Sequence, residues 1–411
     1  MHIALYSPAW PPEEFPNGIV TYVHWMRQEL LGRGHRVSVL AGMTAKGGEW
    51  PGVYGVDAAF SSRAWQWTRR RLGMEKDALF SWGARLAACA GRIHRRHSID
   101  VLEMEESFGW VSALIADHRF PVVVKLHGPA FLSLVEEQLQ GDLARKKIEA
   151  EGSALKSARA ITSPSRCTLS DTLLRYGLHP AIQAHVVNPL ALDSGTRLWS
   201  AASSSRTTLL FVGRFDKRKG GDRVLMAFKK LLQARQDLNL VFVGPDAGLT
   251  SEGGKLIHFD DFCKSLFSSS QRCRINYLGS RPQADIARLR SEAAVTIVAS
   301  RWESQGYTAL EAMLQGCPVV CADTSGLSES VVHGETGLLF QGDDIDAMVD
   351  RIRFMLNHPE SAERLGRAAR AYVLATHGVA HVLDQTLGVY ESAIGDFTGR
   401  GRLPGEQSHA R

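Results

Sequence analysis

Two glutamates, Glu303 and Glu311, bracket a short segment, ESQGYTALE, that directly follows an apolar run. The run, Val295–Ala299, predicts a buried strand, and a helix is expected to begin near Gly306, with Glu311 about a turn and a half into it. Ionised carboxylates only accept hydrogen bonds, so they suit the hydroxyl donors of sugars and ribose. The alternative is a solvent-exposed loop glutamate followed by an ordinary surface helix glutamate.

The turn between these glutamates is suited to an anion. Gly306 lets the backbone come close to a ligand, because glycine lacks a Cβ atom. The amides around Gly306, Tyr307 and Thr308 would open the helix without intrahelical partners and would point at negative charge. Together with the carboxylates, these amides predict a site for a nucleotide diphosphate.

A basic turn is the second candidate. In FVGRFDKRKGGDRVL an apolar strand ends at a glycine, and Arg214 and Lys219 then flank a tight turn before the next helix. A guanidinium fork and a lysine ammonium beside a helix N-terminus predict a clamp for pyrophosphate. The alternative is a solvated basic loop.

Two segments in the first half of the chain carry further candidates. The proline-rich SPAWPPEEFPNGIVTYV leads to Asn17-Gly18 and a helix, which offers a second backbone cradle, although it lacks the pattern G-x-G-x-x-G. His127 ends the strand-like PVVVKLHG, where its imidazole would bond a substrate hydroxyl or move a proton. The alternatives are a plain strand-to-helix loop and a structural histidine.

Short apolar runs that alternate with amphipathic segments predict the α/β class, with parallel strands joined by helices. In the first half the expected strands are His2–Tyr6, Arg36–Ala41, Val101–Met104, Val122–Leu126, Ala160–Ser163 and His185–Val187. In the second half they are Leu209–Val212, Leu240–Val243, Asn276–Leu278, Val295–Ala299, Val319–Cys321 and Gly337–Phe340. Ligands of such sheets bind at the carboxyl ends of the strands, which is where the candidate residues fall.

The chain is expected to form two Rossmann-like, doubly wound domains that face a central cleft. The first spans residues 1–190 and the second residues 207–375, and the small, polar segment 191–206 links them. A length of 411 residues is ample for two full cores. Residues 396–411 are expected to be a disordered tail.

The composition excludes several classes of protein. Lysine and arginine number 48 against 43 acidic residues, and this net charge of +5 suits phosphate ligands or an anionic membrane but is too weak to predict nucleic-acid binding. The six cysteines include no C-x-x-C pair, and no Cys/His cluster or H-E-x-x-H predicts a metal site. Neither a signal peptide nor a run of about eighteen apolar residues is present, so a cytoplasmic chain is expected.

Taken in order, these segments resemble the retaining nucleotide-sugar glycosyltransferases of family 4, which have the GT-B fold. The likeness runs from the first strand to about Tyr390, and its most specific part is the Glu303-to-Glu311 spacing with its EAMLQGCPVV continuation and GETGLLF. GRFDKRKGGDRVLMAF resembles the family's phosphate loop, and GHRVSVL its early strand. The resemblance also implies that a terminal helix, over 376–395, crosses back onto the first domain.

The resemblance implies two overlapping groups of site residues. The catalytic group is Glu303, Lys219, Arg214 and His127. The group that binds the nucleotide-sugar donor is Gly18, Arg214, Lys219, Arg281, Glu303, Gly306, Tyr307, Thr308 and Glu311. Glu303 would contact the transferred sugar, Glu311 the ribose, and the basic turn the diphosphate.

By this resemblance the protein moves a hexose from a nucleoside-diphosphate sugar to a glycan, lipid-linked or small-molecule acceptor, with retention of anomeric configuration. The donor is a substrate, and no cofactor or metal is expected, because Arg214, Lys219 and helix amides would stabilise the leaving diphosphate. In two departures from the family, Asn17 stands where a glycine pair is usual, and Ser304-Gln305 replaces the commoner Pro-Phe. A third is Asn188-Pro189, which lacks the usual preceding proline.

The acceptor side rests on a basic segment, residues 61–97. It holds nine lysines and arginines against two acidic residues, with tryptophans interleaved. This pattern is typical of an interfacial membrane surface, and it would suit a lipid-linked acceptor and peripheral association with the inner membrane face. A solvated helical face with core aromatics is the alternative.

Three other functions share part of this pattern. A sugar phosphorylase or synthase would use the same scaffold, and a nucleotide-sugar-binding protein would have lost catalysis. An NAD-dependent oxidoreductase is disfavoured, because neither half shows the glycine fingerprint after its first strand.

Overall fold

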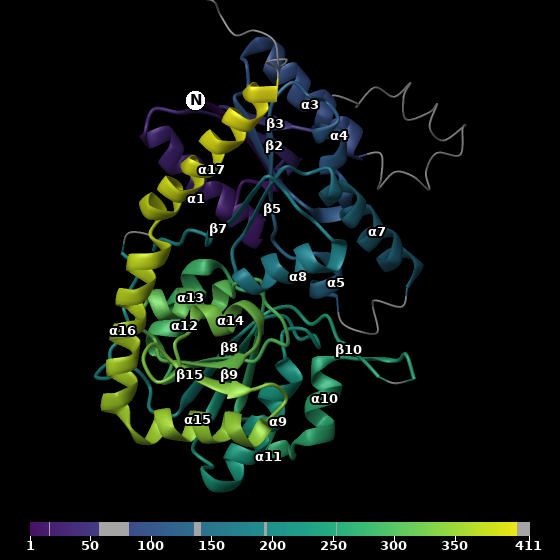
Figure 1. Cartoon of the computed structure of the whole chain (residues 1–411). Coiled ribbons are helices and arrows are strands. Elements are labelled where there is room, and N and C mark those ends of the chain that lie inside the picture. Colours follow the sequence, from purple (N-terminus) through teal and green to yellow (C-terminus); the bar gives the residue numbers. More distant parts are fainter. Residues whose placement is uncertain (16, 57–81, 135–140, 193–194, 252, 401–411) are drawn as a thin grey trace, which may run out of the picture. The chain divides into compact units, whose positions relative to one another are not determined.

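The computed structural model describes residues 1–15, 17–56, 82–134, 141–192, 195–251 and 253–400. The chain divides into two compact units (Figure 1). Unit 1 consists of Met1–Phe131, Gln140–Pro189 and Val379–Arg411, and unit 2 consists of Leu132–Leu139 and Leu190–Gly378. Each unit has its own sheet and its own core.

Unit 1 is built on a seven-stranded parallel sheet in the order β3-β2-β1-β4-β5-β6-β7. The strands are β1 (His2–Trp10), β2 (Arg36–Thr44), β3 (Val53–Gly55), β4 (Val101–Glu105), β5 (Val122–Lys125), β6 (Ala160–Ser163) and β7 (Ile182–His185). The helices are α1 (Gly18–Gly32), α3 (Trp82–Arg96), the 3-10 turn η3 (Ser107–Gly109), α4 (Val111–Ile115), α5 (Ala130–Ser133), α7 (Asp142–Lys156), α8 (Arg166–Tyr176) and α17 (Val379–Arg400). Helix α5 lies where the chain passes between the two units.

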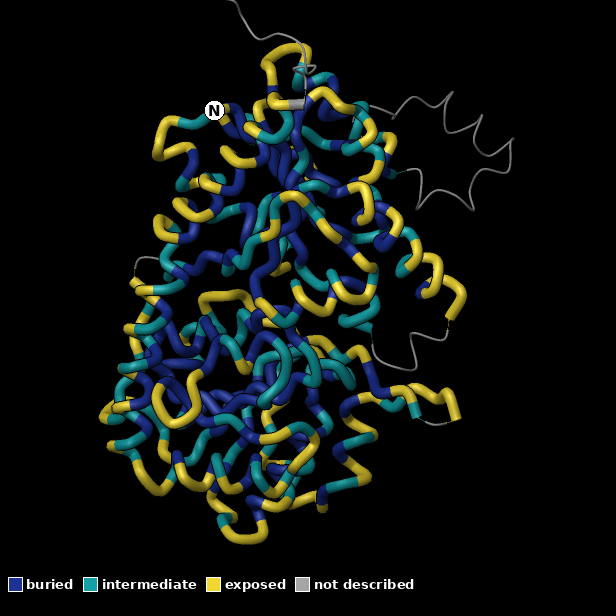
Figure 2. Tube along the Cα trace, viewed as in Figure 1, coloured by how far each residue is buried: buried dark blue, intermediate teal, exposed yellow. Residues whose placement is uncertain are grey.

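Both faces of this sheet are covered, because successive strand residues point to opposite sides. In β1, Ile3 and Leu5 join one buried cluster, and Ala4 and Tyr6 join another. Figure 2 shows the strands as the buried centre of the unit, with exposed residues along the helices. This is the doubly wound arrangement that the sequence predicts.

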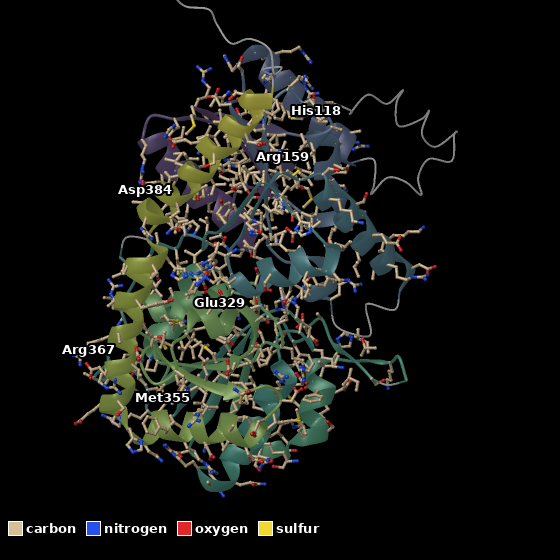
Figure 3. All side chains as sticks on the ribbon, viewed as in Figure 1. His118, Arg159, Glu329, Met355, Arg367 and Asp384 are labelled. Atoms are coloured by element: carbon tan, nitrogen blue, oxygen red, sulfur yellow. The ribbon has the colours of Figure 1, made fainter. Side chains whose placement is uncertain are left out.

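Helix α17 belongs to unit 1 although it comes from the other end of the chain. It packs against α1, β4, β5 and β7, and Figure 1 shows it beside α1. Its Leu383 is fully buried in the core of unit 1. Asp384 and Arg159, which Figure 3 labels, form ion pairs with Arg33 and Asp396 and fasten the helix at two further points. The terminal helix therefore returns to the first half of the chain.

Unit 2 is built on a six-stranded parallel sheet in the order β12-β9-β8-β13-β14-β15. The strands are β8 (Thr208–Val212), β9 (Asn239–Val243), β12 (Ile275–Gly279), β13 (Val295–Val298), β14 (Val319–Asp323) and β15 (Leu338–Gln341), with a small antiparallel hairpin of β10 (Leu249–Thr250) and β11 (Leu256–Ile257). The helices are α9 (Gly221–Ala234), α10 (Phe259–Leu266), α11 (Ser269–Arg272), α12 (Gln283–Glu292), α13 (Tyr307–Leu314), α14 (Ser325–Ser330), α15 (Ile345–Asn357) and α16 (Pro359–His377).

The strand order reverses once in each sheet. The first strand of unit 1, β1, lies beside β4, and the first strand of unit 2, β8, lies beside β13. Ligands of open α/β sheets bind outside the carboxyl ends of the strands at such a reversal. In unit 2 the loops that follow β8 and β13 are those that carry the basic turn and Glu303.

Three sequence expectations are corrected. The strand predicted at His185–Val187 is Ile182–His185. Val186 directly follows it, is buried in the core of unit 1, and still donates its amide to the carbonyl of Ser163 on β6 over 2.9 Å, so the apolar residues mark the buried end of the strand and not its centre. The short strand β3 and the hairpin of β10 and β11 were not predicted. Helix α17 continues to Arg400, past residue 396, where a tail was expected.

Among the described helices, none combines the length and the apolar character that crossing a lipid bilayer requires.

Candidate functional site

The basic turn and Glu303 meet at the carboxyl ends of β8 and β13. The Lys219 ammonium donates to Glu303 Oε1, and Arg218 Nη1 lies 3.8 Å from Glu303 Oε2. Ser300 Oγ, two residues after β13, donates to Glu303 Oε1 over 2.8 Å. The carboxylate, in a residue only 8% exposed, is therefore held by two cations and a hydroxyl.

These neighbours decide the charge of Glu303. Burial by itself would raise the pKa of this carboxyl, but Lys219 and Arg218 outweigh burial, and the pKa lies below its usual range. Glu303 is consequently ionised at neutral pH and can only accept hydrogen bonds. The carboxylate can accept from a ligand hydroxyl when Lys219, Arg218 or Ser300 gives up part of its contact with it.

Only glycine fits at position 220 of the basic turn. Gly220 has a φ of 74°, and a Cβ atom there would lie 1.9 Å from the carbonyl oxygen of Ala299. Asp216 Oδ1 accepts from the amide of Lys219 over 2.6 Å, and Asp216 Oδ2 pairs with half-exposed Arg214 at 2.7 Å. Arg214 thus lies on the same turn as Lys219, paired with Asp216.

Helix α13 begins at Tyr307, four residues after Glu303. Its N-cap, Gly306, has a φ of 86°, in the left-handed region that favours glycine. The amides of Tyr307 and Thr308 lie in the first turn, where helix geometry supplies no acceptor. Lys219 therefore contacts the glutamate that lies four residues before the first residue of α13. The Tyr307 hydroxyl is buried without a hydrogen-bond partner in the described structure.

Glu311 is held by an arginine that sequence reasoning missed. Arg290 of α12 is 1% exposed and donates to Glu311 Oε2. The carboxylate of Glu311 lies on the same helix as the amides of Tyr307 and Thr308, about one turn further along. No local pattern around Arg290 marks it, since its role depends on how α12 packs in the unit.

The remaining predicted residues lie elsewhere. Arg281 follows β12, the edge strand of the sheet of unit 2, and donates to the carbonyl of Ser280 over 3.2 Å. Gly18 and His127 belong to unit 1. Gly18 opens α1, and the preceding Asn17 is its N-cap, with its side chain accepting from the amide of Ile19 at 2.8 Å. The asparagine that departs from the family pattern is therefore explained as a helix cap.

His127 follows β5, and its backbone is fastened by a buried glutamate. Glu106 accepts from the amides of His127 and Gly128 over 2.9 and 2.7 Å. The imidazole packs edge-on against Tyr22, with 5.3 Å between ring centroids. Burial, assisted by Lys125, lowers the pKa of His127 to about 3. The ring is therefore neutral at physiological pH and can donate or accept a hydrogen bond.

Buried carboxylates gather near the end of β4, and the sequence analysis did not single them out. Glu151 of α7 accepts from the amides of Phe108 and Ala130 over 3.2 and 2.8 Å. Burial, followed by the charge of Glu106, raises the pKa of Glu105 to about 8 and that of Glu151 to about 7. In the sequence Glu105 looks like the polar end of a strand and Glu151 like an ordinary helix glutamate, so only the packed structure reveals them.

Within the described ranges, no group of three or more histidine, cysteine, aspartate or glutamate side chains is placed to hold a metal ion. Most of the basic segment 61–97, up to residue 81, lies outside the described residues.

Two family models match most of the chain. The model described as "Glycosyl transferases group 1" matches residues 200–372, and "Glycosyl transferase 4-like domain" matches residues 17–189. The first covers most of unit 2 and the second most of unit 1 up to Pro189. The chain is also 28% identical over 312 residues to D-inositol 3-phosphate glycosyltransferase 1 of Catenulispora acidiphila, an alignment that covers 72% of each chain.

Solved structures share the architecture. Sucrose-phosphate synthase from Thermosynechococcus elongatus superposes with a TM-score of 0.72 at 19% identity, covering 96% of this chain and 99% of the other. Anabaena Alr3699/HepE, solved in complex with UDP and glucose, has a TM-score of 0.65 at 17% identity, covering 95% and 100%. These likenesses show the GT-B fold, two parallel-sheet α/β domains in one chain.

The buried carboxylates predict how stability varies with pH. Glu105 has an ordinary pKa of 4.5 in the unfolded chain and about 8 in the folded chain. Between these values the folded chain binds the proton more tightly, so the contribution of Glu105 to the free energy of unfolding is greatest at low pH and falls as the pH rises from about 4.5 to about 8. Glu105→Gln keeps an oxygen for the Ser107 hydroxyl and should flatten this decline in urea denaturation at about pH 5 and pH 8.

Glu149→Gln, at an exposed position of α7, is the matched control for the loss of one carboxylate. An equally steep decline in Glu105→Gln and the unchanged chain would contradict the assignment.

Proposed function

The chain belongs to the family 4 glycosyltransferases, and we propose that it transfers a hexose from a nucleoside-diphosphate sugar to an acceptor with retention of anomeric configuration. One observation carries the proposal: Lys219, Arg218 and Glu303 meet beside the start of α13, where the strand order of unit 2 reverses. Cations, free amides and an ionised carboxylate match the diphosphate and the hydroxyls of such a donor. The UDP complex of the HepE neighbour supports the same donor class.

The difficult step is breaking the bond between the anomeric carbon and the diphosphate oxygen, because negative charge builds on the leaving group. Lys219, Arg214 and the amides of Tyr307 and Thr308 would stabilise that charge. One preorganised contact of this kind is worth about 3–4 kcal/mol. When the diphosphate takes the ammonium of Lys219, the carboxylate of Glu303 becomes available to hydroxyls of the sugar.

The other residues take supporting roles in this proposal. Glu311, oriented by buried Arg290, would accept from the ribose hydroxyls. Arg281 would contact the base, and Gly18 the diphosphate. His127 would line the sugar site as a neutral imidazole that bonds a hydroxyl. Retention would follow if the acceptor attacks on the face from which the diphosphate leaves, with a phosphate oxygen taking the acceptor's proton.

Ligand-induced stabilisation tests the donor class. Uridine, guanosine and adenosine diphosphates and their sugars are screened against the whole chain by thermal unfolding. A ligand that binds only the folded state at about 100 times its Kd adds about 2.7 kcal/mol of stability. We expect at least one of these nucleotides to raise Tm, and a chain indifferent to all of them would refute the proposed function.

Product analysis separates the alternatives. A glycosyltransferase releases a nucleoside diphosphate in step with sugar transfer. A phosphorylase on this scaffold would depend on inorganic phosphate and form no nucleotide product. A binding protein that has lost catalysis would gain stability from the donor and release no nucleotide when an acceptor is supplied.

Substitution of the charged groups tests the mechanism. Lys219→Ala and Glu311→Ala are each expected to lower turnover by about two orders of magnitude or more, because each removes a donor contact. Lys230→Ala is the matched control, since Lys230 is an exposed lysine of α9 that pairs with Asp346. Nucleotide release and circular dichroism are measured on all three. Near-normal turnover in a folded Lys219→Ala variant would remove Lys219 from the mechanism.

We also propose that the basic segment binds a membrane surface that carries a lipid-linked acceptor. Its described part lies on α3, whose last turn contains His94, Arg95 and Arg96. The chain is expected to co-sediment with vesicles rich in phosphatidylglycerol, and less so after Arg69, Arg70 and Arg71 are replaced by glutamine. Absence of binding, or binding that these replacements leave unchanged, would favour a small-molecule acceptor, the class to which the D-inositol 3-phosphate relative points.

A further inference from the structure

Arg301, two residues before Glu303, connects the loop after β13 to the basic turn after β8. Its amide donates to the carbonyl of Arg218 over 2.7 Å, and its guanidinium donates to the carbonyl of Lys217. The same guanidinium grips Asp222 with two parallel bonds of 2.9 and 2.7 Å. One residue therefore holds two successive carbonyls of the turn and the first turn of the helix that follows it.

These bonds determine where the cations of the turn point. Lys217 and Arg218 precede Lys219 directly, so fixing their carbonyls limits the directions that the Lys219 side chain can take. Asp216 Oδ1, on the N-terminal side of the same turn, accepts from the amide of Lys219 over 2.6 Å. Lys219 thus projects from a turn that is fastened on both sides, and its ammonium reaches Glu303.

Neighbouring carboxylates compensate the positive charge of Arg301. Asp222 binds it in fork-to-fork geometry, and the pair is largely buried, with 22% of the Arg301 side chain and 13% of the Asp222 side chain exposed. Asp343 lies 3.5 Å away as a second carboxylate. With its charge neutralised, Arg301 contributes geometry that depends on the planar fork of guanidinium donors, which lysine cannot reproduce.

We propose that Arg301, with Asp222, is a positioning residue that holds Lys219 in the direction required to bind the donor diphosphate. The inference rests on the proposed function and extends it to a residue that does not itself contact the donor. A misplacement of about 1 Å can cost about a hundredfold in rate, and residues that orient metal ligands by comparable bonds change metal affinity by about 10- to 100-fold.

Arg301→Lys tests the proposal, because it keeps the charge and loses the fork. Binding of UDP and GDP is measured by calorimetry, together with uridine and guanosine, which lack the diphosphate. We expect the affinity for the diphosphate that binds the unchanged chain to fall about tenfold, while the affinity for its nucleoside stays the same. Asp222→Asn, nearly equal in size, should produce the same pattern and serves if Arg301→Lys folds poorly.

A double-mutant cycle with Lys219 distinguishes positioning from general stabilisation. In the Lys219→Ala background, Arg301→Lys should cause no further loss of diphosphate affinity, since the group that it positions is absent. Arg370→Lys is the matched control: Arg370 donates to the carbonyl of Leu314 at the far end of α13, over 2.7 Å. It should lower Tm without changing diphosphate affinity.

Three outcomes would overturn the proposal. Unchanged diphosphate affinity in both Arg301→Lys and Asp222→Asn would show that the turn does not depend on this pair. Equal losses for the diphosphate and the nucleoside would indicate a structural role, as would a full further loss in the Lys219→Ala background. If the unchanged chain binds neither UDP nor GDP, the proposed function falls first and this inference falls with it.

Discussion

The contact between Lys219 and Glu303 is the constraint on which the rest of the site depends. A carboxylate as buried as that of Glu303 is costly unless cations and hydrogen bonds compensate it. Lys219, Arg218 and Ser300 provide that compensation from the loops after β8 and β13. Each loop therefore holds its shape because the other is in place, and the reversal of strand order between β8 and β13 makes their meeting possible.

The two units use the same topology with opposite electrostatics. At the reversal in unit 2, two cations and a hydroxyl surround one ionised carboxylate. At the reversal in unit 1, buried carboxylates accept from backbone amides, so that Glu106 and Glu151 fasten the loops that follow β4 and β5. The charge of unit 2 suits a polyanionic donor. In unit 1 the carboxylates are buried and occupied by protein donors, and His127 is neutral, so this reversal lacks the cations that a phosphate needs.

The sequence was informative where function depends on neighbours along the chain. Gly306, Glu303 and Lys219 lie in short strand-to-helix segments, so spacing alone predicts where they stand at the ends of the strands. Arg290, Arg301 and Glu106 act on residues that pair with them only after the chain folds, and no local pattern indicates them. The strand near His185 was predicted a few residues too late for a different reason: apolar residues occur both in strands and in the buried segments beside them.

The resting ion pair also bears on turnover under the proposed mechanism. A nucleoside diphosphate that takes the ammonium of Lys219 leaves the buried carboxylate of Glu303 with less compensation from Arg218 and Ser300. An intact donor restores the balance, because its sugar hydroxyls donate to the carboxylate that its diphosphate has uncovered. The nucleoside diphosphate product lacks those hydroxyls, so it occupies the ammonium of Lys219 and leaves Glu303 without a donor. Re-formation of the Lys219–Glu303 ion pair therefore favours release of the product. The same contact would thus favour binding of the donor and release of the product.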